Sequence, residues 1–296
     1  MFRFNFVGGD GREGDDVEDA PPASPVAHEP EAAGCLRRCK ELTPPVSPVS
    51  PVTSDSKARH GMEFADFGVS NVCSVRKAAN PVVDVAAGAP AESDLVPGLY
   101  EGGYKVWECS IDLSKYIAKD PDVSTIFRPG TKVIELGCGQ GLVGVVALAL
   151  GAGEVHFQDY DEGVVRDLTI PVVEENIQVF GATPRPKARF FAGDWGTLCP
   201  DVLRPQDLVN AYDVVLTTET IYNEEASIRL LSCIKSCLKP DGVCYLSAKS
   251  FYFGVGGGVA GFQNLLDRDG TLRHRTVQII DDGRSNRREI LELCAR

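Results

Sequence analysis

Five short apolar runs constrain the fold of this chain more than any other feature. Each ends at a polar residue or a glycine, and their starts lie roughly 20 to 35 residues apart, at Lys132, Glu154, Ala188, Tyr212 and Val243. Such runs are typical of strands buried on both faces, and the spacing leaves room for a helix between consecutive strands. The sequence therefore predicts an α/β fold with a Rossmann-like, mostly parallel sheet and helices on both of its faces.

The segments near the C-terminal end refine this prediction. Asn223 can cap a helix that ends before the Lys-Pro-Asp-Gly sequence at 239–242. Two strand-like segments at 276–280 and 288–293 flank an Asp-Asp-Gly sequence at 281–283, which is a hairpin signal. We therefore expect the sheet to finish with an antiparallel C-terminal strand.

The first 90 residues differ in composition from the rest of the chain. Between residues 8 and 33, eight acidic residues against one arginine contribute -7 of the net charge of -12. Eight prolines then fall between Pro21 and Pro51, which disfavours helices and sheet ladders. We expect residues 1–90 to form a disordered, acidic and proline-rich tail, and residues 91–296 to form a single folded domain of catalytic size.

The overall composition excludes several classes of protein. The net charge of -12 argues against a dedicated binder of nucleic acid or anionic lipid. The longest apolar run, at 142–150, is far shorter than the roughly 20 residues that a membrane span requires, and no signal peptide opens the chain. The ten cysteines lack metal-ligand spacing, so we expect reduced thiols and no metal site. These features predict a soluble protein of the cytoplasm and nucleus.

A glycine-rich motif lies where the first predicted strand gives way to a helix. It begins at Glu135, and Gly137, Gly139 and Gly141 let a ligand approach the backbone closely. Asp159 follows Gly139 by twenty residues, so the motif also fits a dinucleotide-binding turn. The motif predicts a site for a nucleoside-containing cofactor, with a purely structural turn as the alternative.

Glu135 separates the two classes of cofactor. A phosphate-binding turn does not require an acid two residues before its first glycine, whereas a sulfonium-bearing cofactor tolerates one well. S-Adenosylmethionine is positively charged and carries no phosphate, and Asp159 can accept hydrogen bonds from both of its ribose hydroxyls. We therefore predict S-adenosylmethionine as the cofactor.

Polar and aromatic residues follow the later strands, at the edge where parallel α/β sheets bind their ligands. After the third strand, Asp194 offers an acceptor for an adenine amino group, and Trp195 offers a flat apolar surface. After the fourth strand, Thr218, Glu219 and Tyr222 are placed in the same crevice. Both groups are candidates for the functional site.

Four longer strings carry a family resemblance. They are DLVPGLYEGGYKVWECS at 94–110, HFQDY at 156–160, TETIYN at 218–223 and AKSFYFGVGGG at 248–258. Together they resemble the histidine protein methyltransferase 1 family of the seven-β-strand methyltransferases, over about residues 94 to 294. Glu219 and the tyrosine three residues later match the acid-x-x-aromatic motif that marks this group after strand four.

The resemblance implies a seven-stranded methyltransferase fold and a specific reaction. A methyl group would pass from S-adenosylmethionine to the tele nitrogen of a histidine in a large-subunit ribosomal protein, the third of that subunit. Chaperones or pre-ribosomal particles are further candidate partners, and sequence-specific nucleic acid and membranes are not expected. The implied cofactor contacts are Val106, Trp107, Glu108, Cys109, Ser110, Gly137, Gln158, Asp159, Tyr160, Gly193, Asp194, Trp195 and Thr218. From sequence position alone, Trp107 and Glu108 either wall the cofactor pocket or pack a leading helix.

Methyl transfer from a sulfonium is an in-line displacement, for which alignment matters more than a strong base. A histidine side chain, with a pKa of about 6.5, is largely neutral at neutral pH. We expect Glu219, or alternatively Asp112, to accept a hydrogen bond from the ring nitrogen that does not react, and Tyr222 to shape the slot. Capping of the following turn is the other role open to Glu219. The glycine-rich segment 251–258 is either a lid or substrate clamp, or a tight turn into a helix.

Two other functions fit the sequence. A protein-lysine methyltransferase of the same superfamily would share these motifs, but it must deprotonate a group with a pKa of about 10.4. A non-catalytic module that binds a ribosomal protein would keep the fold alone. The presence of the glycine turn together with Asp159 and Asp194 speaks against this second alternative.

Overall fold

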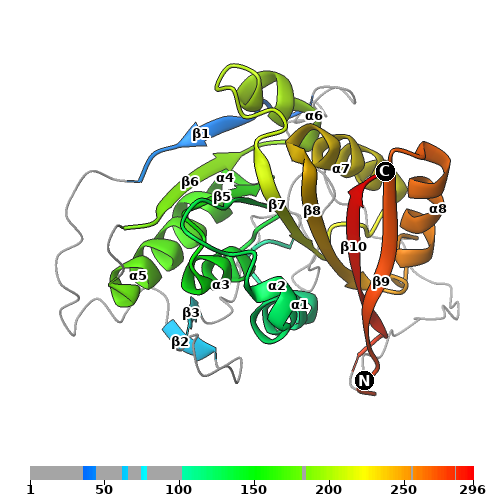
Figure 1. Ribbon diagram of the computed structural model, residues 1–296, viewed down its shortest axis with the longest axis horizontal. Helices are drawn as coiled ribbons and strands as arrows, with labels where there is room; N and C mark the ends of the chain where they lie inside the picture. The colour runs from blue at the N-terminus through cyan, green and yellow to red at the C-terminus, as the bar shows by residue number, and fades with distance from the viewer. Residues whose placement is uncertain are drawn as a thin grey trace, which may run out of the picture. The chain divides into compact units, whose positions relative to one another are not determined.

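The computed structural model describes residues 36–44, 62–65, 75–78, 102–181, 185–254, 256–283 and 285–296. In this part of the chain, an eight-stranded sheet runs in the order β1-β6-β5-β4-β7-β8-β10-β9 (Figure 1). Its strands are β1 (Lys40–Leu42), β4 (Lys132–Leu136), β5 (Glu154–Asp159), β6 (Lys187–Ala192), β7 (Tyr212–Thr218), β8 (Leu238–Lys249), β9 (Leu272–Ile280) and β10 (Arg288–Ala295). A second, two-stranded sheet pairs β2 (Met62–Ala65) with β3 (Val75–Ala78) in antiparallel orientation.

The five central strands are parallel and coincide with the five apolar runs of the sequence. β4 pairs with β5 on one side and with β7 on the other, while β6 extends the sheet beyond β5 and β8 extends it beyond β7. The direction of winding therefore reverses between β4 and β7, and such a switch point is where α/β sheets bind ligands at their carboxyl edge. The predicted Rossmann-like fold is confirmed.

The sheet ends in antiparallel strands, as predicted. β10 lies between β8 and β9 and is antiparallel to both. The predicted helix is also present as α7 (Glu224–Cys237), and the side chain of Asn223 caps it by accepting a hydrogen bond from the amide of Ala226 at 2.7 Å. β8 begins directly after this helix, so the Lys-Pro-Asp-Gly sequence at 239–242 belongs to the strand.

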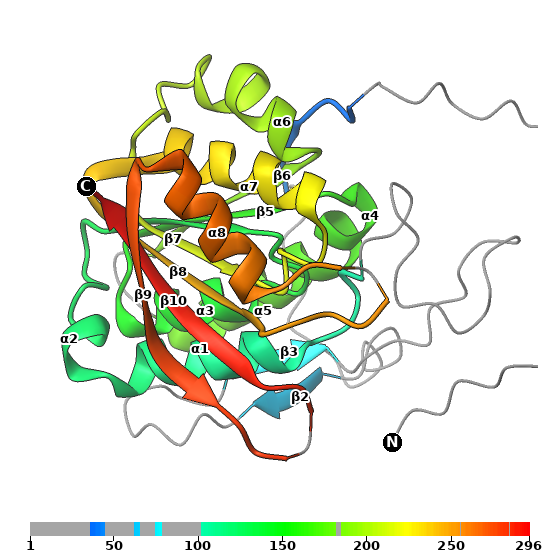
Figure 2. The same ribbon diagram turned by 90° about the vertical axis from the view of Figure 1, so that its right-hand side faces the viewer.

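Helices cover both faces of the sheet (Figure 2). One face carries α1 (Glu108–Lys119), α2 (Pro121–Ser124), α3 (Leu142–Leu150) and α5 (Ile170–Phe180), and the other carries α6 (Trp195–Leu198), α7 and α8 (Val259–Asp269). The short helix α4 (Glu162–Val164) and two π-helical turns, Val165–Thr169 and Cys199–Leu203, connect these elements. Val214 and Leu216 pack on the first face, and Val215 packs on the second, because neighbouring strand residues point to opposite sides.

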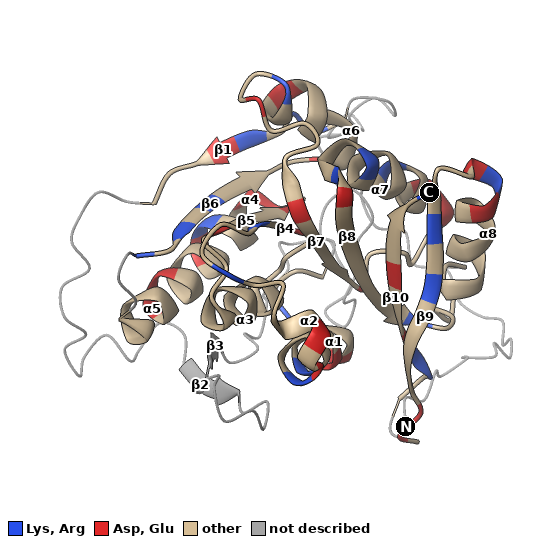
Figure 3. Ribbon diagram, in the orientation of Figure 1, with Lys and Arg blue, Asp and Glu red and all other residues tan. Residues whose placement is uncertain are grey.

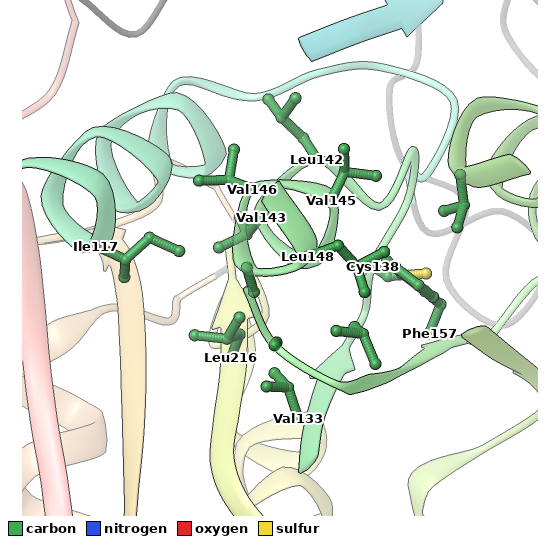
Figure 4. Close-up of a cluster of buried hydrophobic side chains, with 14 of the residues drawn as sticks. Ile117, Val133, Cys138, Leu142, Val143, Val145, Val146, Leu148, Phe157 and Leu216 are labelled. Carbon is green, nitrogen blue, oxygen red and sulfur yellow. The ribbon is translucent and has the colours of Figure 1, made fainter. Parts of the chain in front are cut away.

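The helix α3 fixes the glycine-rich turn in space. Its residues from Leu142 to Leu148 are all buried, and Figure 4 shows their side chains on several sides of the helix, with Val133 and Leu216 on the side that faces the sheet. A helix that is apolar on all sides packs against other elements in every direction. The position of its first residue relative to the sheet is therefore fixed. The turn between β4 and α3 is thereby anchored at both ends.

Three strands lie within the stretch 1–90 that the sequence predicts to be a disordered tail. β1 pairs antiparallel with β6, and Lys40 is opposite Ala192. The prediction of disorder is therefore wrong for 36–44, because pairing with a sheet edge orders a segment that has no core pattern of its own. The acidic stretch before residue 36 and the prolines beyond residue 44 lie outside the described residues. No helix in the described ranges has the length and apolar character to cross a membrane.

Candidate functional site

The turn between β4 and α3 requires glycine for two reasons. Gly137, Gly139 and Gly141 have positive φ angles of 66°, 51° and 75°, which other residues adopt only with strain. A Cβ atom on Gly137 would lie 2.6 Å from Thr220 Cγ2, and one on Gly139 would lie 2.9 Å from the carbonyl oxygen of Gly103. The turn therefore holds the segment before α1 and the segment after β7 against the end of β4.

Glu135 anchors this turn through a hydrogen bond to the start of α3. Its side chain is 1% exposed, and its Oε2 accepts a hydrogen bond from the amide of Gly144, in the first turn of α3, at 2.8 Å. Burial raises the pKa of the Glu135 carboxyl to about 8. The structure gives this carboxyl an anchoring role at the helix start, and the predicted proximity of Glu135 to the cofactor stays a prediction.

Asp159 is held beside the turn, as predicted. It ends β5, and its Oδ2 accepts a hydrogen bond from the amide of Gly139 at 2.8 Å, while its Oδ1 accepts one from the amide of Asp161 at 3.1 Å. Burial raises the pKa of its carboxyl to about 6. Each carboxylate oxygen keeps acceptor capacity beyond one hydrogen bond, so the group can still accept from a ligand.

Gln158 joins the ends of three neighbouring strands. Its Nε2 donates to the carbonyl oxygen of Gly193 at 2.7 Å, and its Oε1 accepts from Trp195 Nε1 at 2.8 Å. The Trp195 ring also lies against the glycine turn, 3.5 Å from where a Cβ of Gly137 would be. The structure thus brings together Gly137, Gln158, Gly193 and Trp195, four of the predicted cofactor residues.

Two further predicted residues, Asp194 and Tyr160, have protein partners on this side of the site. Asp194 caps α6, because its Oδ1 accepts from the amide of Gly196 at 2.7 Å, and its Oδ2 lies 3.5 Å from Arg229 Nε. The ring of Tyr160 lies under the guanidinium carbon of Arg37 at 4.7 Å. The Asp194 carboxylate is therefore fixed in orientation, and its role as an adenine acceptor stays a prediction.

Glu219 follows β7 at the other side of the switch point. Its φ angle is 59°, a left-handed conformation that is strained for a residue with a Cβ. Its side chain is 8% exposed, its Oε2 accepts a hydrogen bond from the Tyr252 hydroxyl, and its Oε1 lies 3.6 Å from Lys249 Nζ. Strain of this kind persists only where the surrounding contacts hold it, and here these contacts aim the carboxylate.

Lys249, the last residue of β8, connects Glu219 with the start of α1. Its Nζ lies 3.5 Å from Glu108 Oε2 and 5.2 Å from the ring centre of Trp107. Cys109 is fully buried next to this cluster, and burial together with the Glu219 carboxylate raises the pKa of its thiol. Trp107 and Glu108 therefore lie next to the Glu219 cluster, and their contact with the cofactor stays a prediction.

The sequence reasoning missed Lys249 and Tyr252 as site residues. The end of the fifth apolar run marks the position of Lys249, because all parallel strands end at the same edge. Tyr252 has no comparable signal, since it comes within reach of Glu219 only through the bend after β8. Both residues become recognisable once the strand order is known.

Asp112, the alternative partner for the substrate ring, is engaged elsewhere. Its Oδ2 lies 2.6 Å from Nε of Arg288, whose side chain is 3% exposed. A buried guanidinium holds its carboxylate strongly, since separating them would leave an unpaired buried charge. This pairing leaves Glu219 as the better placed acceptor.

The remaining predicted residues occupy the edges of the site. Val106 packs, partly buried, against the core, and Ser110 Oγ donates to the carbonyl oxygen of Trp107 at 2.7 Å. Thr218 is the last residue of β7 and pairs with Ser247 of β8. These contacts position the backbone around Glu108 and Glu219.

The glycine-rich segment after β8 packs on the loop that carries Tyr222. A Cβ on Gly257 would lie 2.2 Å from the Tyr222 carbonyl carbon, so this approach excludes any larger residue. Phe251 and Phe253 are 46% and 74% exposed, and their rings meet edge to face at 4.7 Å. The segment thus forms a tight turn into α8 and also presents two aromatic rings to solvent, and its motion as a lid stays a prediction.

The donor and acceptor set fits S-adenosylmethionine. Asp159 can accept from ribose hydroxyls, Trp195 offers an apolar face, and Gln140 Oε1 is buried with no hydrogen-bond partner in the described part of the chain. An unpartnered buried acceptor in this turn is suited to a hydroxyl or ammonium donor of a ligand. Within the same residues, no group of three or more His, Cys, Asp or Glu side chains is arranged to hold a metal ion.

Comparison of the sequence with known proteins places this chain among methyltransferases. A family model described as "Lysine methyltransferase" matches residues 98–252. The histidine protein methyltransferase 1 homolog of Mus musculus is 34% identical over 297 residues, which are 93% of this chain and 81% of that protein. The homolog of Dictyostelium discoideum is 40% identical over 68% of this chain and 60% of its own length, and that of Rattus norvegicus is 39% identical over 65% and 57%. The chain thus spans less than two thirds of the last two relatives.

Proposed function

Because this chain belongs to the histidine protein methyltransferase 1 family, we propose that it transfers a methyl group from S-adenosylmethionine to a histidine side chain of a protein. One observation carries the proposal: two groups of residues meet at the carboxyl edge of the sheet. Asp159 lies beside the glycine turn, and Glu219 lies one strand beyond β4, next to the Thr220 that touches Gly137. A cofactor on one side of the switch point then faces an acceptor on the other.

The first group would hold the cofactor. Asp159 accepts from the ribose hydroxyls while its Oδ2 keeps the Gly139 amide, so ligand and turn are fixed by one carboxylate. The Trp195 ring, held by Gln158, covers an apolar face of the adenosine. S-Adenosylmethionine supplies, when bound, a methyl group on a positively charged sulfur.

The second group would position the acceptor. A neutral imidazole attacks through its bare nitrogen, so its other nitrogen must keep the proton and donate it. Glu219 accepts that hydrogen bond and stabilises the positive charge that the ring gains during the reaction. Lys249 and Tyr252 hold the Glu219 carboxylate in one orientation, and the strained backbone at Glu219 lets it point into the site. Alignment of this kind supplies much of the catalysis in a displacement reaction.

The finer identity of the substrate is part of the same proposal. We assign a histidine of the third protein of the large ribosomal subunit, modified at its tele nitrogen, in the cytoplasm or the nucleus. The support for this assignment is the resemblance of the four sequence strings to the family, together with the family membership of the chain. The chain's own acidity suits a basic protein partner, because complementary charge favours association.

Methylation of lysine is the second candidate, because the matching family model is described as "Lysine methyltransferase". A lysine ammonium must lose a proton before it reacts, and Glu219 would have to assist. Lys249 already places a cation 3.6 Å from Glu219 Oε1, and a second ammonium there would be repelled. The cluster therefore favours a neutral acceptor such as imidazole.

An isotope-labelled cofactor separates these functions. The purified full chain is incubated with labelled S-adenosylmethionine and ribosomal extract, and the labelled residue is identified by mass spectrometry. Methylhistidine in the large-subunit protein supports the full proposal, and methylhistidine in another protein corrects the substrate alone. Methyllysine, or no incorporation by a chain that binds the cofactor, contradicts the proposed reaction.

A further inference from the structure

The segment 36–42, here named the strap, runs along the outer edge of the proposed cofactor site. It contains β1, which pairs antiparallel with β6 so that Lys40 lies opposite Ala192 and Leu42 opposite Phe190. Ala192 is the last residue of β6 and directly precedes Gly193. The part of the strap before Lys40 therefore continues past the strand end, alongside the residues expected to meet adenine.

Backbone contacts join the strap to that side of the site. The carbonyl oxygen of Arg37 accepts hydrogen bonds from the Asp194 amide at 3.1 Å and from Thr197 Oγ1 at 2.8 Å. A Cβ on Gly193 would lie 2.5 Å from Cys39 Cα, so the two segments are in direct backbone contact. The Asp194 amide thereby donates to the strap rather than to a ligand, while the side-chain oxygens of Asp194 are acceptors.

The same segment reaches the end of β5, where Asp159 lies. The Arg37 guanidinium carbon is 4.7 Å from the ring centre of Tyr160, the residue that follows Asp159. Lys40 Nζ forms an ion pair with Glu162 Oε2 at 2.7 Å. The strap thus spans both strand ends that are expected to hold the adenosine, one through backbone hydrogen bonds and one through a cation–π contact.

Other contacts hold the strap independently of any ligand. Cys39 is 5% exposed, and its amide donates to Asp201 Oδ2 at 3.2 Å. Arg38 pairs with the same carboxylate at 2.7 Å, and Glu41 forms two hydrogen bonds with Arg189, each of 2.8 Å. Figure 3 shows the opposite charges of β1 side by side on this edge strand. These anchors directly follow Arg37 in the sequence, so the strap is held as part of the domain without a ligand.

We propose that the strap is the outer wall of the S-adenosylmethionine site, and that Arg37 is a positioning residue that holds Tyr160 against the adenosine. The proposal rests on the proposed function, because it assumes the cofactor class. The ligand class is an adenosine derivative, recognised on one side by Asp159 and Tyr160 and on the other by the strap-supported turn at Asp194 and Trp195. The methyl group and the acceptor cluster around Glu219 play no part in this wall.

The test compares arginine substitutions inside and outside the strap, made in the full chain. In Arg37→Ala the cover of Tyr160 is lost, whereas Arg37→Lys keeps a cation over the ring. Arg275→Ala is the control for loss of an exposed arginine, because Arg275 of β9 pairs with Glu292 at the other edge of the sheet from the strap. Dissociation constants for S-adenosylmethionine, S-adenosylhomocysteine and 5′-methylthioadenosine are measured by calorimetry, with thermal unfolding of each variant beside them.

We expect Arg37→Ala to weaken all three ligands by a similar factor of roughly 5 to 10, as loss of one cation–π contact implies. Arg37→Lys should recover most of that affinity, and Arg275→Ala should stay within about twofold of wild type. Turnover of Arg37→Ala at saturating cofactor should match that of wild type, because the wall does not touch the reacting atoms. A merely structural role would instead lower the melting temperature and leave ligand affinity unchanged.

The outcomes distinguish failure of the proposed wall from failure of the proposed function. If wild type binds the ligands and Arg37→Ala binds them equally well, the wall is refuted and the proposed function stands. If wild type binds none of the three, both fail together. Amide hydrogen exchange of 36–42 gives a second reading that is independent of folding losses in a variant: ligand binding to wild type should slow it, and unchanged exchange would refute the wall.

Discussion

The two halves of the site are held together by different kinds of contact. Around Asp159, the contacts are mostly hydrogen bonds to backbone amides, and the ionisable groups are buried, with raised carboxyl pKa values of about 6 for Asp159 and about 8 for Glu135. Around Glu219, the contacts join charged side chains from three elements, with Lys249 between Glu108 and Glu219. The proposed cofactor half is thus a shaped turn, and the proposed acceptor half is an electrostatic cluster.

This difference teaches what each half can tolerate. A turn made of left-handed glycines has no alternative sequence, because its backbone conformation and its close contacts both exclude a Cβ. A cluster of charges depends instead on mutual orientation, and it loses function in steps as partners are removed. Substitutions in the first half should change cofactor affinity, and those in the second half should change turnover.

The largest effect is expected from Asp159→Asn. The variant loses two charge-assisted hydrogen bonds to ribose hydroxyls, so S-adenosylmethionine should bind roughly 100- to 1,000-fold more weakly. Calorimetry measures the dissociation constant, and Asp167→Asn, on the exposed surface nearby, is the matched control. Binding within threefold of wild type would show that Asp159 serves only the turn.

Glu219→Gln should act on turnover rather than on affinity. It removes one charged acceptor from the substrate ring, and the turnover number should fall roughly 10- to 100-fold while the cofactor dissociation constant stays within about twofold. Single-turnover methylation assays with the full chain check this, and Glu225→Gln on the exposed face of α7 is the control. Wild-type turnover in Glu219→Gln would indicate that Glu219 only caps the following turn.

Tyr252→Phe tests whether the Tyr252 hydroxyl orients the Glu219 carboxylate. Loss of the hydroxyl that donates to Glu219 should lower turnover roughly three- to tenfold, because the carboxylate becomes less well oriented. The effect in a double variant with Glu219→Gln should be less than additive, since both residues act through one carboxylate. Tyr116→Phe, whose ring packs against Tyr245, is the control for loss of a tyrosine hydroxyl. Additive losses would separate Tyr252 from Glu219.

Glu135→Gln should change the pH dependence of stability more than it changes methyl transfer. The folded-state pKa of about 8 is above the ordinary value of 4.5, so between these values the folded protein keeps a proton that the unfolded chain releases. The free energy of unfolding contributed by Glu135 therefore falls as pH rises from about 4.5 to 8. Urea unfolding at several pH values should show a flatter profile in Glu135→Gln, which still accepts from Gly144. An unchanged slope would contradict the raised pKa.

The residues of the proposed cofactor half could be predicted from the sequence because they lie close together along the chain. Gly137, Gly139 and Gly141 lie within five residues, and the spacing to Asp159 is that of one strand-helix-strand unit. Glu135 shows the limit of such reasoning. Its position in the motif was clear, but only the packing of α3 on the sheet turned its carboxyl toward the amide of Gly144.

The acceptor half was predicted only in part. Glu219 was found because it follows a strand, whereas Lys249 and Tyr252 contact it from 30 and 33 residues away along the chain. Asp112 was proposed on position and is instead paired with Arg288, which is 176 residues distant. Side chains of this kind have no local pattern, because their partners are decided by which strand ends lie next to each other.

The sequence by itself determined the parallel sheet, the antiparallel end and the glycine turn, because apolar periodicity and backbone conformation are properties of neighbouring residues. The tertiary structure alone decided that residues 36–42 close the sheet beside β6, and that Lys249 joins Glu108 to Glu219. The physical reason is that edge pairing and ion pairs depend on distances between segments far apart in the chain, and these distances exist only after the core has packed.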